Sequence, residues 1–164
     1  MGSFRLLAKY SIIAFARQLE GEEMERKQRV LILCTGNSCR SQMAEGLIEH
    51  HLGETWEARS AGTNPAGIVH PLAVTVMAEI GVDISNGVPE HVDAYLAQAW
   101  DLVITVCDSA HEICPVFPSP IETLHVSFPD PADAEGSRAE KLEVFRFIRD
   151  AIRERLMPKI EHRV

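Results

Sequence analysis

The segment at residues 34–41 constrains this chain most strongly, because it reads CTGNSCRS directly after the apolar run VLIL at 30–33. Five residues separate Cys34 from Arg40, and the apolar run predicts a strand that leads into this loop. Gly36 permits a tight turn in which successive backbone N–H groups point inward at an oxyanion. Arg40 adds a planar guanidinium that can bind two oxygens of a tetrahedral anion. The spacing therefore predicts an anion-binding loop with a cysteine at its base.

Cys34 is the candidate nucleophile of this loop. A helix predicted at 40–52 would direct its positive dipole end at the loop, and both this dipole and Arg40 favour a thiolate over a thiol. Ser41 can donate a further hydrogen bond to the thiolate. We therefore expect a strongly lowered pKa for Cys34 and nucleophilic attack on a phosphate-like centre. The plainer alternative is a buried cysteine beside a surface arginine.

The loop itself supplies the expected oxyanion-binding residues. They are Thr35, Gly36, Asn37, Ser38, Cys39, Arg40 and Ser41. Cys39 fits as a small residue whose thiol is packed and takes no part in the chemistry. Asn37 and Ser38 are expected to brace the loop through hydrogen bonds.

Apolar periodicity and turn residues divide the rest of the chain into alternating strands and helices. The predicted strands cover 29–34, 56–61, 102–106 and 124–127, and the predicted helices cover 40–52, 71–80, 92–99 and 138–156. Residues 107–120 contain three prolines and are expected to form a loop with at most one helical turn. Strands that alternate with helices imply a parallel sheet with right-handed crossovers. We predict a single α/β domain at residues 29–160, with a four-stranded parallel sheet flanked by helices.

Residues 1–28 precede this domain as an N-terminal extension. Residues 4–19 are amphipathic, and three interpretations are open: a signal peptide, an appended helix, or a natural start at Met24. Lys9 interrupts the apolar region, and no clean cleavage site of small residues follows. The favoured interpretation is therefore an extra N-terminal helix or a dispensable extension.

Charge and cysteine content limit the partners and the compartment. A formal net charge of −8 argues against a broad nucleic-acid-binding surface, and no apolar stretch approaches the length needed to cross a bilayer. The four cysteines fall into two pairs, Cys34/Cys39 and Cys107/Cys114, which is typical of catalytic or redox thiols in a reducing cytoplasm. We expect a cytoplasmic monomer that binds neither nucleic acid nor membranes.

Two thiols are expected to lie near one pocket. Ligands of parallel α/β sheets bind at the carboxyl ends of strands, and Cys34 and Cys107 each end a predicted strand. Cys114 follows Cys107 at a distance that a flexible loop can close, which favours a redox pair over a cysteine that only packs in the core. Asp130, next to the stiff Pro131, could protonate a departing oxygen, although Asp-Pro alone is also a turn signal.

These segments together give the chain a family resemblance. It resembles thioredoxin-coupled arsenate reductases, which share the fold of low-molecular-weight protein tyrosine phosphatases, from about residue 30 to the last helix. The matching segments are CTGNSCRSQMAEG at 34–46, SAG at 60–62, DIS at 83–85, DLVITVC at 101–107, CP at 114–115 and DPA at 130–132. The Cys107/Cys114 pair separates the reductases from the plain phosphatases.

The resemblance implies a mechanism. Arsenate would lie in the loop, held by backbone amides and Arg40, while Cys34 attacks arsenic and Asp130 protonates the leaving oxygen. Cys107 would then attack the Cys34 sulfur and release arsenite. Cys114 would next attack Cys107, giving a Cys107–Cys114 disulfide that thioredoxin reduces. The electrons enter as thiols, so no bound organic cofactor is expected.

The resemblance also implies a potassium ion beside the loop, since some of the reductases bind one. The matching positions are Asn37, Glu45, Ser60 and Glu90, and Glu90 stands where an aspartate is common. Their oxygen atoms suit a hard cation. A second departure from the family pattern is Pro129, which replaces an acidic residue often seen before the catalytic aspartate.

Two other functions remain open. A phosphatase would use the same loop and form a phosphoenzyme on Cys34, but Ala132-Asp133 stands where phosphatases of this fold usually carry a tyrosine. A non-enzymatic thiol sensor or metal-binding module would use Cys107, His111 and Cys114, but their spacing is not a usual zinc pattern and the anion loop would have no role. The remaining histidines are expected to be surface or packing residues: His50, His51, His70, His91, His125 and His162.

Overall fold

The computed structural model describes residues 26–112, 115–117 and 121–163. Cys114 and most of the N-terminal extension lie outside these ranges, so the structure does not place the features predicted there. Of the helices inside these ranges, none combines the length and the apolar character that a bilayer span requires.

Four parallel strands form the centre of the fold, in the order β2-β1-β3-β4. Their bounds are β1 Gln28–Cys34, β2 Trp56–Gly62, β3 Leu102–Thr105 and β4 Glu122–His125. β1 pairs with β2 along its whole length and with β3 from Val30 to Leu33, and its last pair with β2 joins Cys34 to Gly62. The predicted four-stranded parallel sheet is confirmed. Its central strand ends at Cys34, so the sheet positions the base of the loop.

The core explains why β1 reads as one continuous apolar run. Val30, Leu31, Ile32 and Leu33 have no exposed surface, because β1 has a strand on each side and packing on both faces. Neighbouring strands and helices fill the same core with large apolar side chains, among them Trp56, Leu47, Ile104, Phe145 and Ile152.

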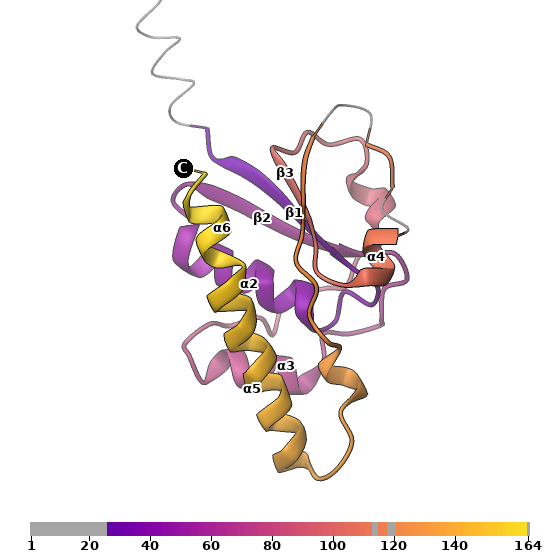
Figure 1. Cartoon of the computed structure of the whole chain (residues 1–164), viewed down its shortest axis with the longest axis vertical. Helices are drawn as coiled ribbons and strands as arrows, with labels where there is room; N and C mark the ends of the chain where they lie inside the picture. The colour runs from indigo at the N-terminus through magenta and orange to yellow at the C-terminus, as the bar shows by residue number, and fades with distance from the viewer. Residues whose placement is uncertain (1–25, 113–114, 118–120, 164) are drawn as a thin grey trace, which may run out of the picture.

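Helices follow the strands in alternation. The longer ones are α2 Arg40–Leu52, α3 Pro71–Ala78 and α5 Arg138–Arg155, and the short ones are η1 Val92–Tyr95, α4 Asp108–Glu112, η2 Pro131–Asp133 and α6 Met157–Glu161. α5 packs against α2 and α3, and α6 continues from it back toward α2, as Figure 1 shows. α4 contacts β1 and β3 and lies across the molecule from α6 (Figure 1).

Several boundaries differ from the predicted ones: the helix predicted at 92–99 is only the 3-10 helix η1, Val92–Tyr95, and the helix predicted at 71–80 ends at Ala78. Two further differences have identifiable reasons. β4 covers Glu122–His125, not 124–127, because burial continues beyond the strand: Val126 and Phe128 are buried and still donate backbone hydrogen bonds to residues at the end of β3. The predicted helix at 138–156 divides at Leu156, since Pro158 in the first turn of α6 has no N–H with which to continue α5. The apolar pattern therefore predicted which residues are buried better than it predicted which residues pair in the sheet.

Candidate active site

The loop predicted from sequence connects β1 to α2. Its backbone reverses at Asn37, which has a φ of 47° and is the one non-glycine residue with positive φ in the described chain. Gly36, expected to carry the turn, does not have positive φ, and a Cβ there would meet only the Ser38 side chain at 3.7 Å. Asparagine tolerates this left-handed conformation better than most residues, so Asn37 makes the turn in place of glycine.

The Cys34 sulfur lies at the base of the loop, and the side chain is almost fully buried. It accepts a hydrogen bond from the Asn37 backbone N–H at 3.1 Å and lies 2.9 Å from the Ser41 hydroxyl oxygen. The expected contact with Ser41 is therefore present. Both donors are aimed at the sulfur, which is the environment a thiolate needs.

Burial nevertheless dominates the acidity of Cys34. Removal from water raises the pKa of the Cys34 thiol, while the hydrogen bonds from Ser41 and Asn37 and the charge of Arg40 lower it. The expected strong lowering of the pKa is therefore wrong for this arrangement. The loop supplies the predicted stabilising groups, but the guanidinium of Arg40 is already engaged elsewhere.

Arg40 bonds to the segment that follows β4. Its Nη1 donates to the Phe128 carbonyl at 2.9 Å, and its Nη2 donates to an Asp130 carboxylate oxygen at 2.5 Å. Its buried Nε atom has no hydrogen-bond partner within the described part of the chain. The structure thus brings together Cys34, Arg40 and Asp130, as the sequence predicted, and pairs the two charged residues with each other.

This pairing predicts that Asp130→Asn lowers the pKa of Cys34, because the charge of Arg40 is then no longer neutralised by its partner. The measurement is the pH dependence of iodoacetamide alkylation at Cys34, read by peptide mass spectrometry. Asp133→Asn is the matched control, since Asp133 lines the same cavity but forms no ion pair within the described residues. An alkylation midpoint that stays the same or rises in Asp130→Asn would contradict the role given to the ion pair.

Asn37 holds the loop from below through its side chain. The amide nitrogen donates to the hydroxyls of Ser41 and Ser60 at 2.9 and 2.8 Å, and the amide oxygen accepts from the Glu90 backbone N–H at 2.9 Å. Ser60 in turn donates to Glu45 at 2.5 Å. The structure therefore places the four residues expected around a potassium ion in one connected network beneath the loop.

Charge in this network is only partly compensated. Burial raises the pKa of Glu45 against the opposing hydrogen bond from Ser60, and the Glu90 carboxylate accepts a hydrogen bond from the Tyr95 hydroxyl. Neither carboxylate forms an ion pair with a described lysine, arginine or histidine. Hard oxygen donors around a half-buried carboxylate that has no ion-pair partner among the described residues match the chemistry of a potassium ion, so the residues present fit such an ion.

The second thiol, Cys107, lies beside the loop. Its sulfur is 3.5 Å from the Thr35 hydroxyl oxygen and accepts a hydrogen bond from the Ala110 backbone N–H at 3.4 Å. A cavity of about 510 Å³ is lined by both parts of the site: Thr35, Arg40, Cys107, Asp108, Ser109, Ser127, Phe128, Pro129, Asp130 and Asp133. The expected convergence of two thiols at one end of the sheet is therefore present, whereas Cys114 lies outside the described residues.

The third described thiol, Cys39, is a packed one. Its side chain is 3% exposed, and burial raises its pKa to about 12. It lines a small cavity of about 10 Å³ together with Cys34 and the loop residues, with Asp130 at its edge. A thiol that resists ionisation to this degree is a poor nucleophile, which agrees with the packing role expected for it.

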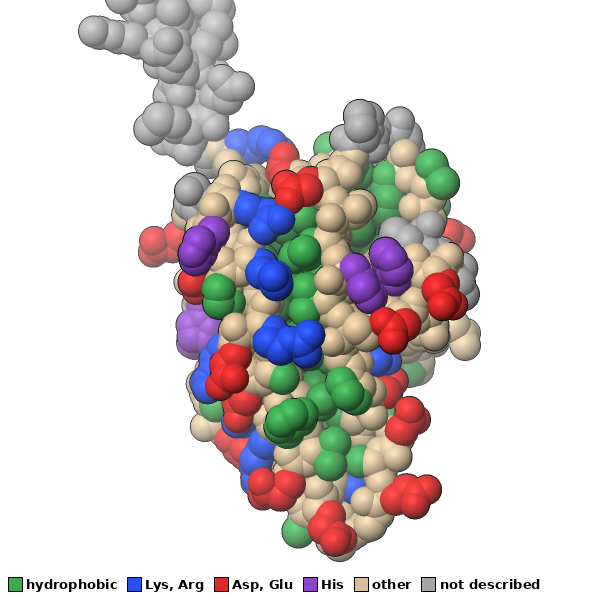
Figure 2. Space-filling view, viewed as in Figure 1, with side chains coloured by type: hydrophobic (Ala, Val, Ile, Leu, Met, Phe, Trp, Pro, Cys, Tyr) green, Lys and Arg blue, Asp and Glu red, His purple; other side chains and the backbone are tan. Residues whose placement is uncertain are grey.

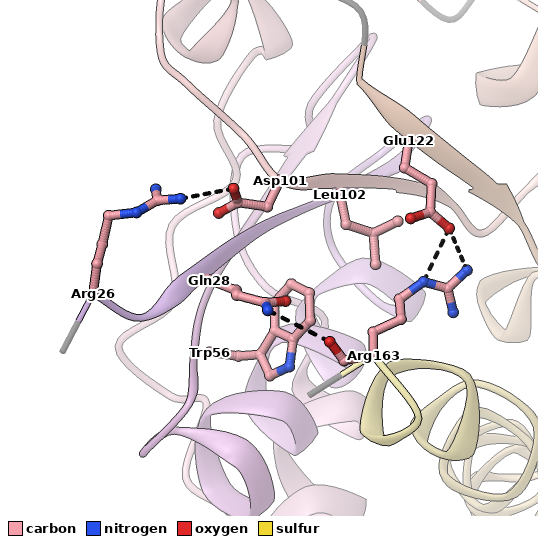
Figure 3. A pocket seen from close by; sticks show the side chains of 7 residues that line it. All are labelled: Arg26, Gln28, Trp56, Asp101, Leu102, Glu122 and Arg163. Carbon is pink, nitrogen blue, oxygen red and sulfur yellow. Dashed lines mark hydrogen bonds and ion pairs between the residues drawn. The ribbon is translucent and has the colours of Figure 1, made fainter. Parts of the chain in front are cut away.

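A second large cavity lies at the opposite end of the sheet. It measures about 490 Å³ and is lined by Arg26, Gln28, Trp56, Asp101, Leu102, Glu122 and Arg163 (Figure 3). Its two arginines are already paired, Arg26 with Asp101 and Arg163 with Glu122. This cavity carries no thiol or free cation among its described lining residues, so the chemistry belongs to the loop end.

The metal-binding alternative at the second thiol includes Cys114, which lies outside the described residues. Within the described ranges, no group of three histidine, cysteine, aspartate or glutamate side chains is placed to hold a metal ion. The imidazole Nδ1 of His111 instead lies 3.4 Å from the Thr105 hydroxyl oxygen. Sequence reasoning did not anticipate this contact, nor the carbonyl of Phe128 as a partner of Arg40, because both depend on which loops pack together.

Comparison with known proteins agrees with this geometry. Residues 29–162 match the sequence profile of the family described as low molecular weight phosphotyrosine protein phosphatase. The arsenate reductase of Halalkalibacterium halodurans is 49% identical over 130 residues, which cover 79% of this chain and 93% of that protein. That of Bacillus subtilis is 44% identical over 127 residues, which cover 77% of this chain and 91% of that protein.

A solved structure of a thioredoxin-dependent arsenate reductase from Corynebacterium glutamicum superimposes with a TM-score of 0.63 at 32% identity, covering 88% of this chain and 67% of that one. With the loop, the two thiols and these relatives in agreement, the chain belongs to the low molecular weight phosphotyrosine protein phosphatase family, among the arsenate reductases that share this fold.

Proposed function

We propose that this protein reduces arsenate to arsenite through a relay of three cysteines, Cys34, Cys107 and Cys114, and that thioredoxin recycles it in the cytoplasm. The observation that carries the proposal is the position of a second thiol at the anion loop: the Cys107 sulfur is 3.5 Å from the Thr35 hydroxyl oxygen. A phosphatase does not need that thiol, whereas a reductase does. The identity to named arsenate reductases supports the same substrate.

Binding of the oxyanion would use the loop amides of residues 35–41 together with Arg40. The guanidinium would turn from Asp130 and the Phe128 carbonyl toward the anion, exchanging one set of charged hydrogen bonds for another. Asp130 would then be free to act as the general acid at the same cavity.

The first chemical step forms a bond between sulfur and arsenic. The Cys34 thiolate attacks arsenic, and the bond from arsenic to one hydroxyl group of arsenate breaks as that hydroxyl takes a proton from Asp130 and leaves as water. In the second step the Cys107 thiolate attacks the Cys34 sulfur. The S–As bond breaks, its electron pair stays on arsenic, and arsenite departs from a Cys34–Cys107 disulfide.

The last step frees the nucleophile for another cycle. Cys114 attacks Cys107, which releases Cys34 as a thiolate and leaves a Cys107–Cys114 disulfide. Thioredoxin then returns two electrons by thiol exchange. The balance is one arsenate reduced for each dithiol oxidised, and no bound organic cofactor is required.

The experiment is a coupled assay of arsenate-dependent NADPH oxidation with thioredoxin and thioredoxin reductase. We expect turnover by the unmodified protein and none by Cys107→Ser or Cys114→Ser, while both variants keep hydrolysis of an aryl phosphate. Full arsenate turnover by either variant would refute the relay. Aryl phosphate hydrolysis with no arsenate reduction by the unmodified protein would establish the second candidate, a phosphatase with a Cys34 phosphoenzyme, which the shared loop and Asp130 favour.

We also propose that a potassium ion binds beneath the loop at Asn37, Glu45, Ser60 and Glu90. Its role there is electrostatic: it would offset the charge of the half-buried Glu45 and so stiffen the network under Asn37. Because the pKa of Glu45 is raised in the folded state, ionisation of this carboxyl lowers the free energy of unfolding once the pH is above the pKa of the folded state. The destabilisation disappears below the pKa of the unfolded state, which is about 4.

Glu45→Gln is therefore expected to raise the melting temperature at pH 7.5 by about 2–4 °C in choline chloride, and to leave it unchanged near pH 4. Replacing choline chloride with potassium chloride at equal ionic strength should stabilise the unmodified protein. It should therefore reduce the difference in melting temperature between Glu45→Gln and the unmodified protein. Glu54→Gln, at an exposed carboxylate, is the control. Equal melting temperatures in the two salts for the unmodified protein would refute the potassium site.

A further inference from the structure

His125, the last residue of β4, joins three elements beside the second thiol. Its ring stacks on that of His111 in α4, with centroids 4.1 Å apart and planes 26° from parallel. Its Nδ1 lies 2.7 Å from the Thr105 hydroxyl oxygen at the end of β3, and its Nε2 lies 3.1 Å from a carboxylate oxygen of Asp108 in α4. Figure 2 shows histidine and acidic side chains next to one another where Figure 1 places α4.

The hydrogens of this cluster can be assigned in one consistent direction. Asp108 accepts, because hydrogen bonds from Ser127 and His125 lower its pKa and keep it ionised, so His125 donates through Nε2–H. His125 Nδ1 then accepts from the Thr105 hydroxyl, and Thr105 accepts from Nδ1–H of His111 at 3.4 Å. The chain of hydrogen bonds starts and ends on α4, so it closes a ring through β3 and β4.

This closed set of hydrogen bonds holds α4 in place, and α4 is too short to be stable as an isolated helix. α4 has five residues, far fewer than an isolated helix needs in water. It begins directly after Cys107, and the Ala110 N–H that bonds the Cys107 sulfur belongs to it. Holding α4 at Asp108 and His111 therefore also holds the direction of the Cys107 thiol.

We propose that His125 is a positioning residue that orients Cys107 for attack on the Cys34 adduct. The inference rests on the proposed function and adds a residue to it. The first step, attack of Cys34 on the anion, uses no atom of α4 and should not depend on His125. The second step requires the Cys107 sulfur in line with the S–As bond, where a displacement of about 1 Å can cost roughly 100-fold in rate.

The experiment isolates that second step in the full chain carrying Cys114→Ser, which stops the relay at the Cys34–Cys107 disulfide. The rate at which that disulfide forms is measured in a single turnover with saturating arsenate, by rapid quench, alkylation and mass spectrometry. Adding His125→Ala should slow it at least about 10-fold, while half-saturating arsenate and aryl phosphate hydrolysis stay within about 2-fold.

Two further variants separate positioning from general stability. In His125→Gln the side-chain amide reaches the place of Nε2 and can still donate to Asp108, so most of the rate should return. In His125→Asn the amide reaches only the place of Nδ1, so the rate should stay as low as in His125→Ala.

Three results would overturn the inference. One is a rate in His125→Ala equal to that of its parent. Another is a parallel loss of aryl phosphate hydrolysis, which would mean that His125 only supports the fold. The third is the absence of a Cys34–Cys107 disulfide when the parent variant, Cys114→Ser, reacts with arsenate. This result would overturn the proposed function itself, and it can be distinguished from the other two because it is seen before His125 is changed.

Discussion

Replacing Cys34 with serine is expected to abolish arsenate reduction and aryl phosphate hydrolysis together, each by on the order of 10⁴-fold or more. The Asn37 amide and the Ser41 hydroxyl are aimed at this sulfur, and a serine hydroxyl in their place would hardly ionise near neutral pH. Loss of both activities distinguishes Cys34 from Cys107, whose replacement should remove only the reduction.

Both assays should be run on the same preparations, with melting temperature as a check on folding. Cys39→Ser is the matched control, because it removes a buried thiol from the same loop and keeps the backbone N–H. It should retain activity within about 10-fold of the unmodified protein, since that thiol takes no part in the proposed chemistry. Substantial arsenate reduction by Cys34→Ser would mean that another thiol is the nucleophile.

Gly62→Ala is expected to cost about 1–3 kcal/mol of folding free energy and roughly 100-fold in activity. A Cβ at this last residue of β2 would lie 2.4 Å from the Thr35 carbonyl oxygen and 3.1 Å from Cβ of Asn37. These neighbours are the backbone and root of the anion loop, which cannot yield as a flexible side chain would. The loop must shift, and its donors would move away from Cys34.

Gly67→Ala provides the comparison, because a Cβ there meets no atom within 4 Å. Chemical denaturation gives the change in stability, and kcat/KM for an aryl phosphate gives the change in the loop. We expect Gly67→Ala to match the unmodified protein in both. If Gly62→Ala also matched it, the tight contact between β2 and the loop would have no functional weight.

Local patterns in the sequence were sufficient for much of the fold and for the loop. The apolar run at 30–33 predicted β1, and the period of apolar residues after Arg40 predicted α2 to the same bounds that the structure has. Strand ends that carry Cys34 and Cys107 predicted one shared pocket. Each of these features depends on neighbours within a few residues or on a general property of parallel sheets.

Contacts between distant loops lay beyond that reasoning. Arg40 forms an ion pair with Asp130 across 90 residues, and no local pattern predicted that pairing. The expected lowering of the Cys34 pKa was wrong because burial of the sulfur outweighs the hydrogen bonds and the charge of Arg40 that favour the thiolate. His125 was expected only at the surface or in packing, because nothing in its sequence neighbourhood points to Asp108 or Thr105. Such contacts depend on how segments that are distant in the sequence pack against each other in the fold, and short sequence patterns do not determine that packing.

The ion pair between Arg40 and Asp130 also sets a condition on which anions the loop can bind. An incoming anion must interact with the Arg40 guanidinium more favourably than the Asp130 carboxylate, at 2.5 Å, and the Phe128 carbonyl already do. Chloride, with one charge and no fixed geometry, has little to offer in that exchange, whereas a tetrahedral dianion can engage the fork and the loop amides at once. Selectivity among anions thus begins with the contact that an incoming anion has to displace.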